Sequence, residues 1–180
     1  MINKEIKFRN ETIKVDIFEK KDFKSLKEIF KKWIELNKKL KELNGRSMNV
    51  PDVLSEGLFC LLFNAYRTRN SAHSYDAVDI KRNKGIQLKS SSILNDLSSF
   101  GPKYTWDELY FIDFAPEGKI NGEVHFYKVD NEIQTVVLNY EKNETFKAQQ
   151  EQGRRPRLSI KQKLINYKNI KPILKINLLD

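Results

Sequence analysis

The chain has 180 residues and a formal net charge of +9, and hydrophobic and aromatic residues make up 39% and 11% of it. This length and composition are typical of one globular domain with its own core, and they argue against intrinsic disorder. The single cysteine, Cys60, excludes an internal disulfide framework and a zinc site built from cysteines. No apolar run approaches the roughly 20 residues of a membrane helix, and the N-terminus lacks a signal-peptide pattern, so we expect a cytoplasmic protein.

The excess positive charge lies towards the two ends of the sequence. Residues 1–50 carry a net charge of +6, residues 51–120 carry −1 and residues 121–180 carry +4. Basic flanks around an acidic centre suit a protein that binds a polyanion and gathers cations at one place. Charge alone fits DNA, RNA or an anionic membrane surface.

The N-terminal part of the chain changes its periodicity once. Residues 5–18 alternate between apolar and polar, which predicts a hairpin or a pair of edge strands. From Asp22 to Gly45 the apolar residues recur every three or four positions, which predicts a long amphipathic helix with a lysine-rich outer face. We expect these elements to form residues 1–47 of a single domain that spans residues 1–180.

Pro51 is predicted to open a second helix, because its fixed φ angle and missing N–H are tolerated in the first helical turn. Glu56 lies off the apolar stripe of this helix, and two interpretations of it stay open. A carboxylate is favoured near a helix N-terminus in any protein, or Glu56 reaches a metal site. The helix begins the expected catalytic core, residues 50–145.

Residues 74–91 form the central stretch of the sequence. Two strand-like runs flank Asn83-Lys84-Gly85, and this turn signal predicts a β-hairpin. A two-residue loop at Asn83-Lys84 would pair Val78 with Lys89.

The polar residues of this hairpin then fall on one face. Asp76, Gln87, Lys89 and Ser91 would project to the same side of the two strands, and Asp79 would point to the other side. A three-residue loop would reverse the choice between the two acids. We therefore prefer Asp76 and keep Asp79 as the alternative.

An acid on one strand, followed by an acid or amide two residues before a lysine on the next strand, suits metal-dependent phosphodiester cleavage. Carboxylate and carbonyl oxygens are ligands for Mg²⁺, which keeps several waters. The lysine can hold or polarise the attacking water and offset the charge that develops in the transition state. The ordinary alternative is the solvated polar face of a sheet.

This arrangement, Asp76 followed by Gln87-Leu88-Lys89, resembles the PD-(D/E)XK nuclease superfamily. Further segments extend the resemblance to small type II restriction endonucleases over roughly residues 50–165: Glu56, Ser90-Ser91-Ser92, Phe100-Gly101-Pro102-Lys103, Trp106-Asp107-Glu108-Leu109-Tyr110 and Gly153-Arg154-Arg155-Pro156-Arg157. One departure is that Gln87 stands where the superfamily usually has an acid. An amide oxygen can bind a metal but brings no charge, so the missing carboxylate would have to come from Glu56 or Asp79.

The resemblance implies an α/β fold of the restriction-endonuclease type, with a mixed β-sheet core flanked by α-helices. It also implies Mg²⁺ as the cofactor and site-specific hydrolysis of double-stranded DNA by a homodimer, paired with a cognate DNA methyltransferase. Asp76 and the Gln87 carbonyl would bind the metal, with Asp79 as the alternative acid. Lys89 would organise the attacking water, and Glu56 would support the site.

The restriction-enzyme group that the chain most resembles cuts short GC-rich palindromes. Two other functions stay open. The chain could be a structure-selective nuclease of the same fold, such as a junction resolvase or repair nuclease, or a non-catalytic nucleic-acid-binding protein.

Further strands and a helix are predicted after the hairpin. Residues 109–115 are apolar enough for a central strand that is buried on both faces. Residues 122–130 and 133–140 are predicted to form an antiparallel pair. A final helix over residues 161–167 and an edge strand over residues 173–178 complete the chain.

The C-terminal segment, residues 146–180, is the expected DNA-contacting part. Arginine can pair with guanine and glutamine with adenine, whereas hydroxyl groups and lysines bind phosphates. The alternative for its basic stretch is a surface turn between two short helices. We expect DNA contacts from Ser90, Ser91, Lys103, Gln152, Arg154, Arg155 and Arg157.

Overall fold

The computed structural model describes residues 1–69, 74–129 and 131–180. Its elements are, in chain order, β1 (Ile2–Phe8), β2 (Glu11–Ile17), α1 (Asp22–Glu42), α2 (Asp52–Phe63), β3 (Tyr66–Thr68), β4 (Ala77–Asp79), β5 (Lys84–Ser91), β6 (Ser98–Ser99), β7 (Glu108–Asp113), β8 (Glu123–Val129), η1 (Asn131–Thr135), β9 (Val137–Asn139), β10 (Glu144–Thr145), α3 (Phe146–Glu151), β11 (Arg157–Leu158), η2 (Lys161–Asn166) and β12 (Leu174–Asn177). Within this part of the chain, no helix combines the length and the apolar character that crossing a membrane requires.

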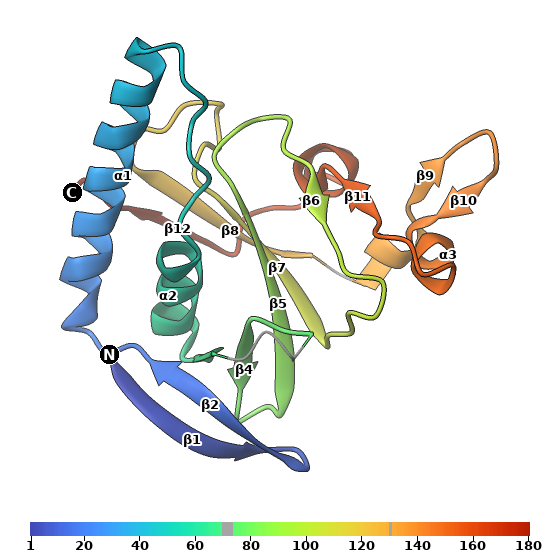
Figure 1. The fold of residues 1–180 in the computed structure, drawn as a ribbon, viewed down its shortest axis with the longest axis horizontal. Helices are drawn as coiled ribbons and strands as arrows, with labels where there is room; N and C mark the ends of the chain where they lie inside the picture. The colour runs from blue at the N-terminus through green and yellow to red at the C-terminus, as the bar shows by residue number, and fades with distance from the viewer. Residues whose placement is uncertain (70–73, 130) are drawn as a thin grey trace.

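A mixed sheet of eight strands forms the centre of the fold (Figure 1). Its strands follow the order β1-β2-β3-β4-β5-β7-β8-β12, and β5 and β7 run parallel to each other while the other neighbours pair antiparallel. Two small two-stranded sheets, β9-β10 and β6-β11, lie beside it. The expected mixed sheet flanked by helices is therefore confirmed.

The helices α1 and α2 cover one face of this sheet. Phe30 and Trp33 of α1 and Leu58 of α2 pack in one core cluster with Ile112 and Phe126 of the sheet. Full burial of side chains of this size stabilises the fold by about 1.5–3 kcal/mol each. The spacing that predicted these two helices is thus the spacing of their buried faces.

The opposite face of the sheet is covered by the C-terminal half of the chain. Phe111 and Val129 of the sheet pack with Phe100, Phe146 of α3 and Leu164 of η2. This second core cluster is built largely from segments that follow β8. The sheet is consequently buried on both faces at β7, as predicted for residues 109–115.

The N-terminal predictions are confirmed. The hairpin consists of β1 and β2, whose residues Ile13 and Val15 are fully buried. The long helix runs from Asp22 to Glu42, and Pro51 immediately precedes the first residue of α2. The indole N–H of Trp33 donates a hydrogen bond to the Asn49 carbonyl at 3.0 Å, which ties α1 to the segment leading into α2.

The predicted register of the β4–β5 hairpin is wrong by four residues. Val78 pairs with Gly85 instead of Lys89, because the turn is longer than two residues and Asp79 pairs with Lys84. The Asp79 carboxylate accepts a hydrogen bond from the Arg82 amide at 3.0 Å, and Asn83 takes a left-handed conformation with φ 53° to close the turn. A shift by an even number of residues leaves each side chain on the same face of the sheet. Asp76, Gln87 and Lys89 therefore still share one face, as predicted.

The predicted antiparallel pair over residues 122–130 and 133–140 is wrong as well. β8 pairs with β7 and β12, residues Asn131–Thr135 form the 3₁₀ helix η1, and β9 pairs with β10. Alternation in sequence marks strands but does not say which strand lies beside which.

The last two predicted elements are close to those observed. The final helix appears as the π-helix η2, over Lys161–Asn166, and the edge strand appears as β12, which pairs with β8.

Candidate active site

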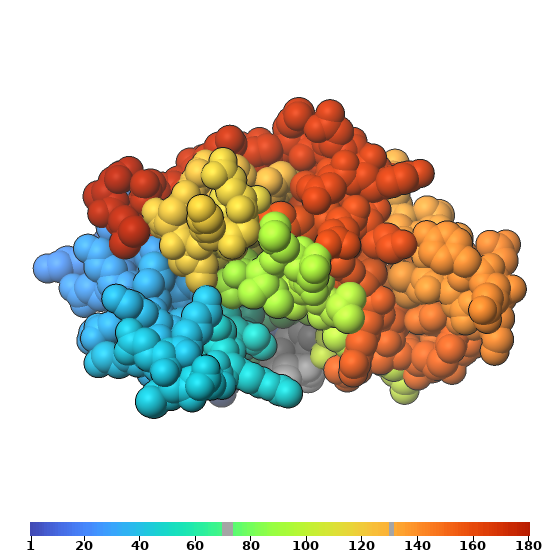
Figure 2. Space-filling model, turned by 90° about the horizontal axis from the view of Figure 1, so that it is seen from above, coloured from blue at the N-terminus to red at the C-terminus, as the bar shows by residue number. Residues whose placement is uncertain are grey.

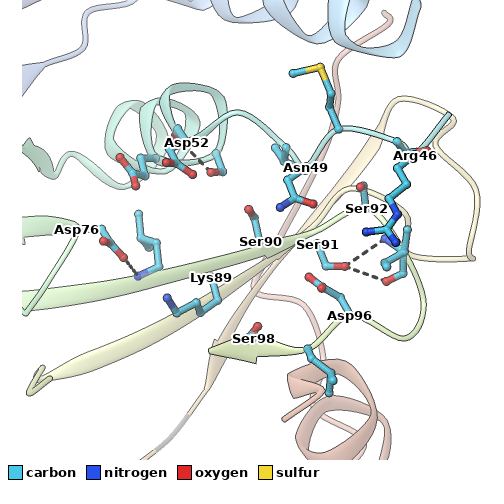
Figure 3. Close-up of a pocket in the computed structure, with 18 residues that line it drawn as sticks. Arg46, Asn49, Asp52, Asp76, Lys89, Ser90, Ser91, Ser92, Asp96 and Ser98 are labelled. Carbon is cyan, nitrogen blue, oxygen red and sulfur yellow. Dashed lines mark hydrogen bonds between the residues drawn. The ribbon is translucent and has the colours of Figure 1, made fainter. Parts of the chain in front are cut away.

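A cavity of about 550 Å³ opens beside the C-terminal half of β5, opposite the first turns of α2 (Figure 3). β4 pairs with β5 only as far as Ile86, whereas β7 continues along the other side of β5 to Ser91. The β4 side of β5 is therefore open beyond Ile86, and the cavity lies there. Figure 2 shows the hollow between the cyan segment near residues 45–50 and the yellow-green segment near residues 92–97.

Asp76 lies at the point where β4 begins and lines the cavity. Its Oδ2 accepts a hydrogen bond from the Leu88 amide at 2.7 Å (Figure 3) and a second one from the side-chain amide of Gln87. Burial raises the pKa of Asp76 above its ordinary value, although the Leu88 amide and the charge of Lys89 act in the opposite direction. The fold thus holds a carboxylate in a place where its negative charge is poorly solvated.

Gln87 is buried next to Asp76 and does not line the cavity, with 1% of its surface exposed. Its Nε2 donates to Asp76 and, at 3.3 Å, to the Leu88 carbonyl. Within the described part of the chain its Oε1 is buried without a hydrogen-bond partner. The Gln87 side chain therefore orients Asp76 through its Nε2, and its buried Oε1 remains available as an acceptor.

Glu56 projects from the second turn of α2 and lines the same cavity. Its Oε2 accepts a hydrogen bond from Nε of Arg67. Burial and the nearby negative charge of Asp76 raise the pKa of Glu56 to about 7, although Arg67 opposes this change. Glu56 therefore lines the same cavity as Asp76 and Lys89, and its role there stays a prediction.

Lys89 lies on β5 and also lines the cavity. Its amino group lies 5.1 Å from the centre of the Phe100 ring, a cation–π contact with a fully buried side chain. Among the described residues, the Lys89 amino group has no hydrogen-bond or ion-pair partner. It is consequently free to bind a phosphate or a water in the cavity.

Two residues that the sequence predicted for the site, Asp79 and Ser91, form hydrogen bonds within their own segments of the chain. Asp79 does not line the cavity; it binds the amide and the guanidinium group of Arg82 in the β4–β5 turn. Burial would raise the pKa of Asp79, but the hydrogen bonds from Arg82 outweigh it and lower that pKa. Ser91 lines the cavity but is 2% exposed, and its hydroxyl group bonds to the backbone of Ile93. Ser90 is half-buried and lines the cavity, and its hydroxyl group forms no such bond with any described residue.

Sequence reasoning missed three charged residues of the cavity: Arg46, Asp52 and Asp96. Asp52 lies one helical turn before Glu56, and side chains four positions apart on a helix share a face. The spacing of four residues between Asp52 and Glu56 could therefore have identified Asp52 from the sequence. Arg46 and Asp96 lie in irregular segments, and their sequence positions carry no periodic signal.

The basic C-terminal stretch lies next to the rim of the cavity. Arg157 and Leu158 of β11 pair with Ser99 and Ser98 of β6, and Ser98 lines the cavity. The Gln150 side chain donates to the Gly101 carbonyl at 2.9 Å. This bond ties α3 to the loop that carries the exposed Lys103.

The arginines of this stretch differ in their partners. Arg154 pairs with Glu144, and this hydrogen bond lowers the pKa of Glu144 to about 2. Arg155 and Arg157 are exposed, as is Gln152, and within the described residues the two arginines form no ion pair. The stretch lies between α3 and η2 and includes β11, and the guanidinium groups of Arg155 and Arg157 are exposed on its surface.

The comparisons with known proteins agree on one family. The profile of the Bsp6I restriction endonuclease family matches residues 18–167. The chain is also similar to the type II restriction enzyme Bsp6I of Bacillus sp. (strain RFL6), with 31% identity over 150 residues, which are 81% of this chain and 82% of the relative. No solved structure matches it significantly. The chain therefore belongs to the Bsp6I restriction endonuclease family.

Proposed function

We propose that the chain is a Mg²⁺-dependent type II restriction endonuclease that hydrolyses phosphodiester bonds of double-stranded DNA, with a site of the PD-(D/E)XK type. The observation that carries the proposal is the convergence of Glu56, Asp76 and Lys89 on one cavity from α2, the start of β4, and β5. The three side chains come from separate elements, and the family of the chain is one of restriction enzymes. A solvated sheet face would not bring them together.

The residues present fit Mg²⁺. This ion keeps several waters and is often held by only one or two carboxylates. Within the described residues no cluster of three His, Cys, Asp or Glu side chains is suited to a metal, but Asp76 and Glu56 both line the cavity. Burial raises the pKa of each, so a bound cation would offset part of the cost of ionising them. The unpartnered Oε1 of Gln87 is a further candidate ligand.

Bound there, Mg²⁺ would supply an activated water and neutralise part of the charge on the phosphate. Lys89 would place its ammonium group beside the attacking water or the phosphate and offset the negative charge that builds up in the transition state. Ser90 would donate its hydroxyl group to a phosphate oxygen. Gln87 and Arg67 would keep the two carboxylates oriented towards the cavity.

We propose that Arg155 and Arg157 contact bases, and that the recognition site is a short GC-rich palindrome. Their exposed guanidinium groups can each pair with the O6 and N7 atoms of guanine. A palindrome presents two identical half-sites, which a two-fold homodimer of this single nuclease domain would match. Host DNA carrying the same site would need protection, which a cognate methyltransferase would give.

The first test is incubation of unmethylated phage DNA with the purified protein, in Mg²⁺ and in EDTA, followed by gel electrophoresis. Discrete Mg²⁺-dependent fragments are expected, and their ends would give the site and the stagger. A smear would instead indicate a nonspecific or repair nuclease. DNA left intact in Mg²⁺ would contradict the proposal and favour a junction-specific enzyme or a purely binding protein.

Lys89→Ala tests the chemistry of the cavity directly. We expect the variant to bind DNA as the wild type does and to cleave it at least about 100-fold more slowly, because a preorganised charge on the transition state is removed. Lys84→Ala, on the same strand but outside the cavity, is the matched control. Cleavage by Lys89→Ala at the control rate would remove Lys89 from the site.

A further inference from the structure

Arg67 joins the cavity to the N-terminal hairpin. It lies at the centre of β3, and its Nε donates to the Glu56 carboxylate. Its Nη1 lies 3.5 Å from Oδ2 of Asp16, on β2. Nε of Arg69 lies 3.3 Å from the other oxygen of Asp16. One guanidinium group therefore bridges a carboxylate of the hairpin and a carboxylate of the cavity.

Asp16 is the buried carboxylate of this ion-pair network. Its side chain is only 4% exposed, and the strand register places it directly opposite Arg67. A buried carboxylate is tolerated when cations pair with it, and it is costly when they do not. The hairpin thus holds Arg67 in place, although Asp16 itself does not line the cavity.

The same short strand also holds Asp76. The Thr68 amide donates to the Asp76 carbonyl at 2.9 Å, and the Thr68 hydroxyl group donates to the same oxygen at 3.1 Å. β3 is three residues long and lies between β2 and β4. Its position, and with it the position of both cavity carboxylates, depends on the hairpin beside it.

We propose that the N-terminal hairpin is a positioning element of the nuclease site, in which Asp16 acts through Arg67 to hold the Glu56 carboxylate towards the cavity. The matched family region begins at residue 18, so the hairpin that contributes this carboxylate lies outside it. The inference rests on the proposed function, in which Glu56 takes part in cleavage. Asp16 is a positioning residue, because it does not line the cavity and contacts the Glu56 carboxylate through Arg67.

Asp16→Asn tests this role, because it keeps the shape of the side chain and removes its charge. We expect the single-turnover cleavage rate to fall by about 10–100-fold, as is typical when a group that orients a site ligand is changed. DNA affinity in EDTA is expected to stay at the wild-type value. Glu5→Gln is the matched control in the same hairpin, since the Glu5 side chain is 63% exposed.

A double-variant cycle separates positioning from general loss of structure. Arg67→Lys keeps a positive charge but loses the planar group that bridges two carboxylates. If Asp16 acts through Arg67, adding Asp16→Asn to Arg67→Lys costs little further activity. If the two losses multiply, Asp16 acts independently and the inference is wrong. All rates are measured well below the melting temperature of the least stable variant.

A second readout does not depend on cleavage. Mg²⁺ raises the melting temperature of a protein that binds it when folded. We expect Asp16→Asn to need more Mg²⁺ than Glu5→Gln does for the same rise, and equal requirements would contradict the inference.

The inference and the proposed function fail in different ways. A wild type that cuts DNA beside an Asp16→Asn variant that cuts equally fast would overturn the inference alone. A wild type that cuts no DNA would overturn the proposed function, and the inference with it. If Asp16→Asn does not fold, Arg67→Lys decides: a normal melting temperature with about tenfold slower cleavage supports the inference, and unchanged cleavage overturns it.

Discussion

Glu56 is a half-buried carboxylate, with 16% of its side chain exposed, and its charge destabilises the metal-free fold. Burial, with the charge of Asp76 adding to it, raises the Glu56 pKa from 4.5 to about 7. Because the folded-state pKa lies above the unfolded-state value, the folded protein binds more protons between these two values. The contribution of Glu56 to stability is therefore fully present below about pH 4.5 and is lost as the pH rises through about 7.

Replacing Glu56 by Gln should remove this loss. The difference between 4.5 and about 7 corresponds to about 3 kcal/mol, at about 1.4 kcal/mol per pKa unit. We expect Glu56→Gln to raise the free energy of unfolding of the metal-free protein by up to about 3 kcal/mol near pH 8 and to leave it unchanged near pH 4. Arg67 keeps Asp16 as a partner in the variant, so its half-buried guanidinium group is not left unpaired.

The assay is urea unfolding of the wild type and the variant at both pH values, with linear extrapolation to water. All other titratable groups are the same in the two proteins, so their contributions cancel in the difference between the two free energies of unfolding. Added Mg²⁺ should stabilise the wild type more than Glu56→Gln near pH 8, because the ion favours ionised Glu56. Glu5→Gln, at an exposed position of the N-terminal hairpin, is the matched control. A Glu56→Gln variant that is equally destabilised at both pH values would refute this reasoning.

Two further predictions concern the other candidate site residues, and a third concerns the buried ion pair between Lys161 and Asp113. Asp76→Asn should abolish cleavage whereas Asp79→Asn should retain it with some loss of stability; the reverse pattern in a DNA cleavage assay would exchange their roles. Changing Arg155 or Arg157 to Ala should weaken DNA binding, by about 1–3 kcal/mol for a contact with a base, and binding isotherms that stay at the wild-type position would exclude them from the interface. Lys161→Met should lower the free energy of unfolding by about 3–5 kcal/mol, because it leaves the fully buried Asp113 carboxylate, 2.6 Å from the lysine, without its ion-pair partner. Urea unfolding measures this, and a smaller decrease would mean that the pair contributes little to stability.

Local patterns in the sequence predicted most of the elements but not all of their partners. The apolar spacing located α1 and α2, because each buries one stripe of its surface in the core. The apolar run over residues 109–115 identified β7 as a central strand. Pairing between distant segments was beyond these patterns, so the partners of residues 133–140 were predicted wrongly.

The site shows the same division between local and distant information. The sequence brought Asp76, Gln87 and Lys89 together, because a hairpin places residues two apart on one face whatever even shift its register takes. It left Glu56 undecided and missed Asp52. The distance from a helix to a hairpin is fixed by packing in the core, and that packing is not written in the spacing of either element.

The sequence by itself determined the excess of basic residues, the α/β class with a mixed sheet flanked by helices, and the acid–amide–lysine hairpin. The tertiary structure alone decided that β4 pairs with β5 only as far as Ile86, which leaves the cavity open beside the rest of β5. It also decided that Gln87 is buried next to Asp76 and does not line the cavity. It also decided that Asp79 closes a turn, and that Asp16 reaches Glu56 through Arg67. Such features depend on where one element ends beside another, and residues far apart in the chain meet only when the core is packed.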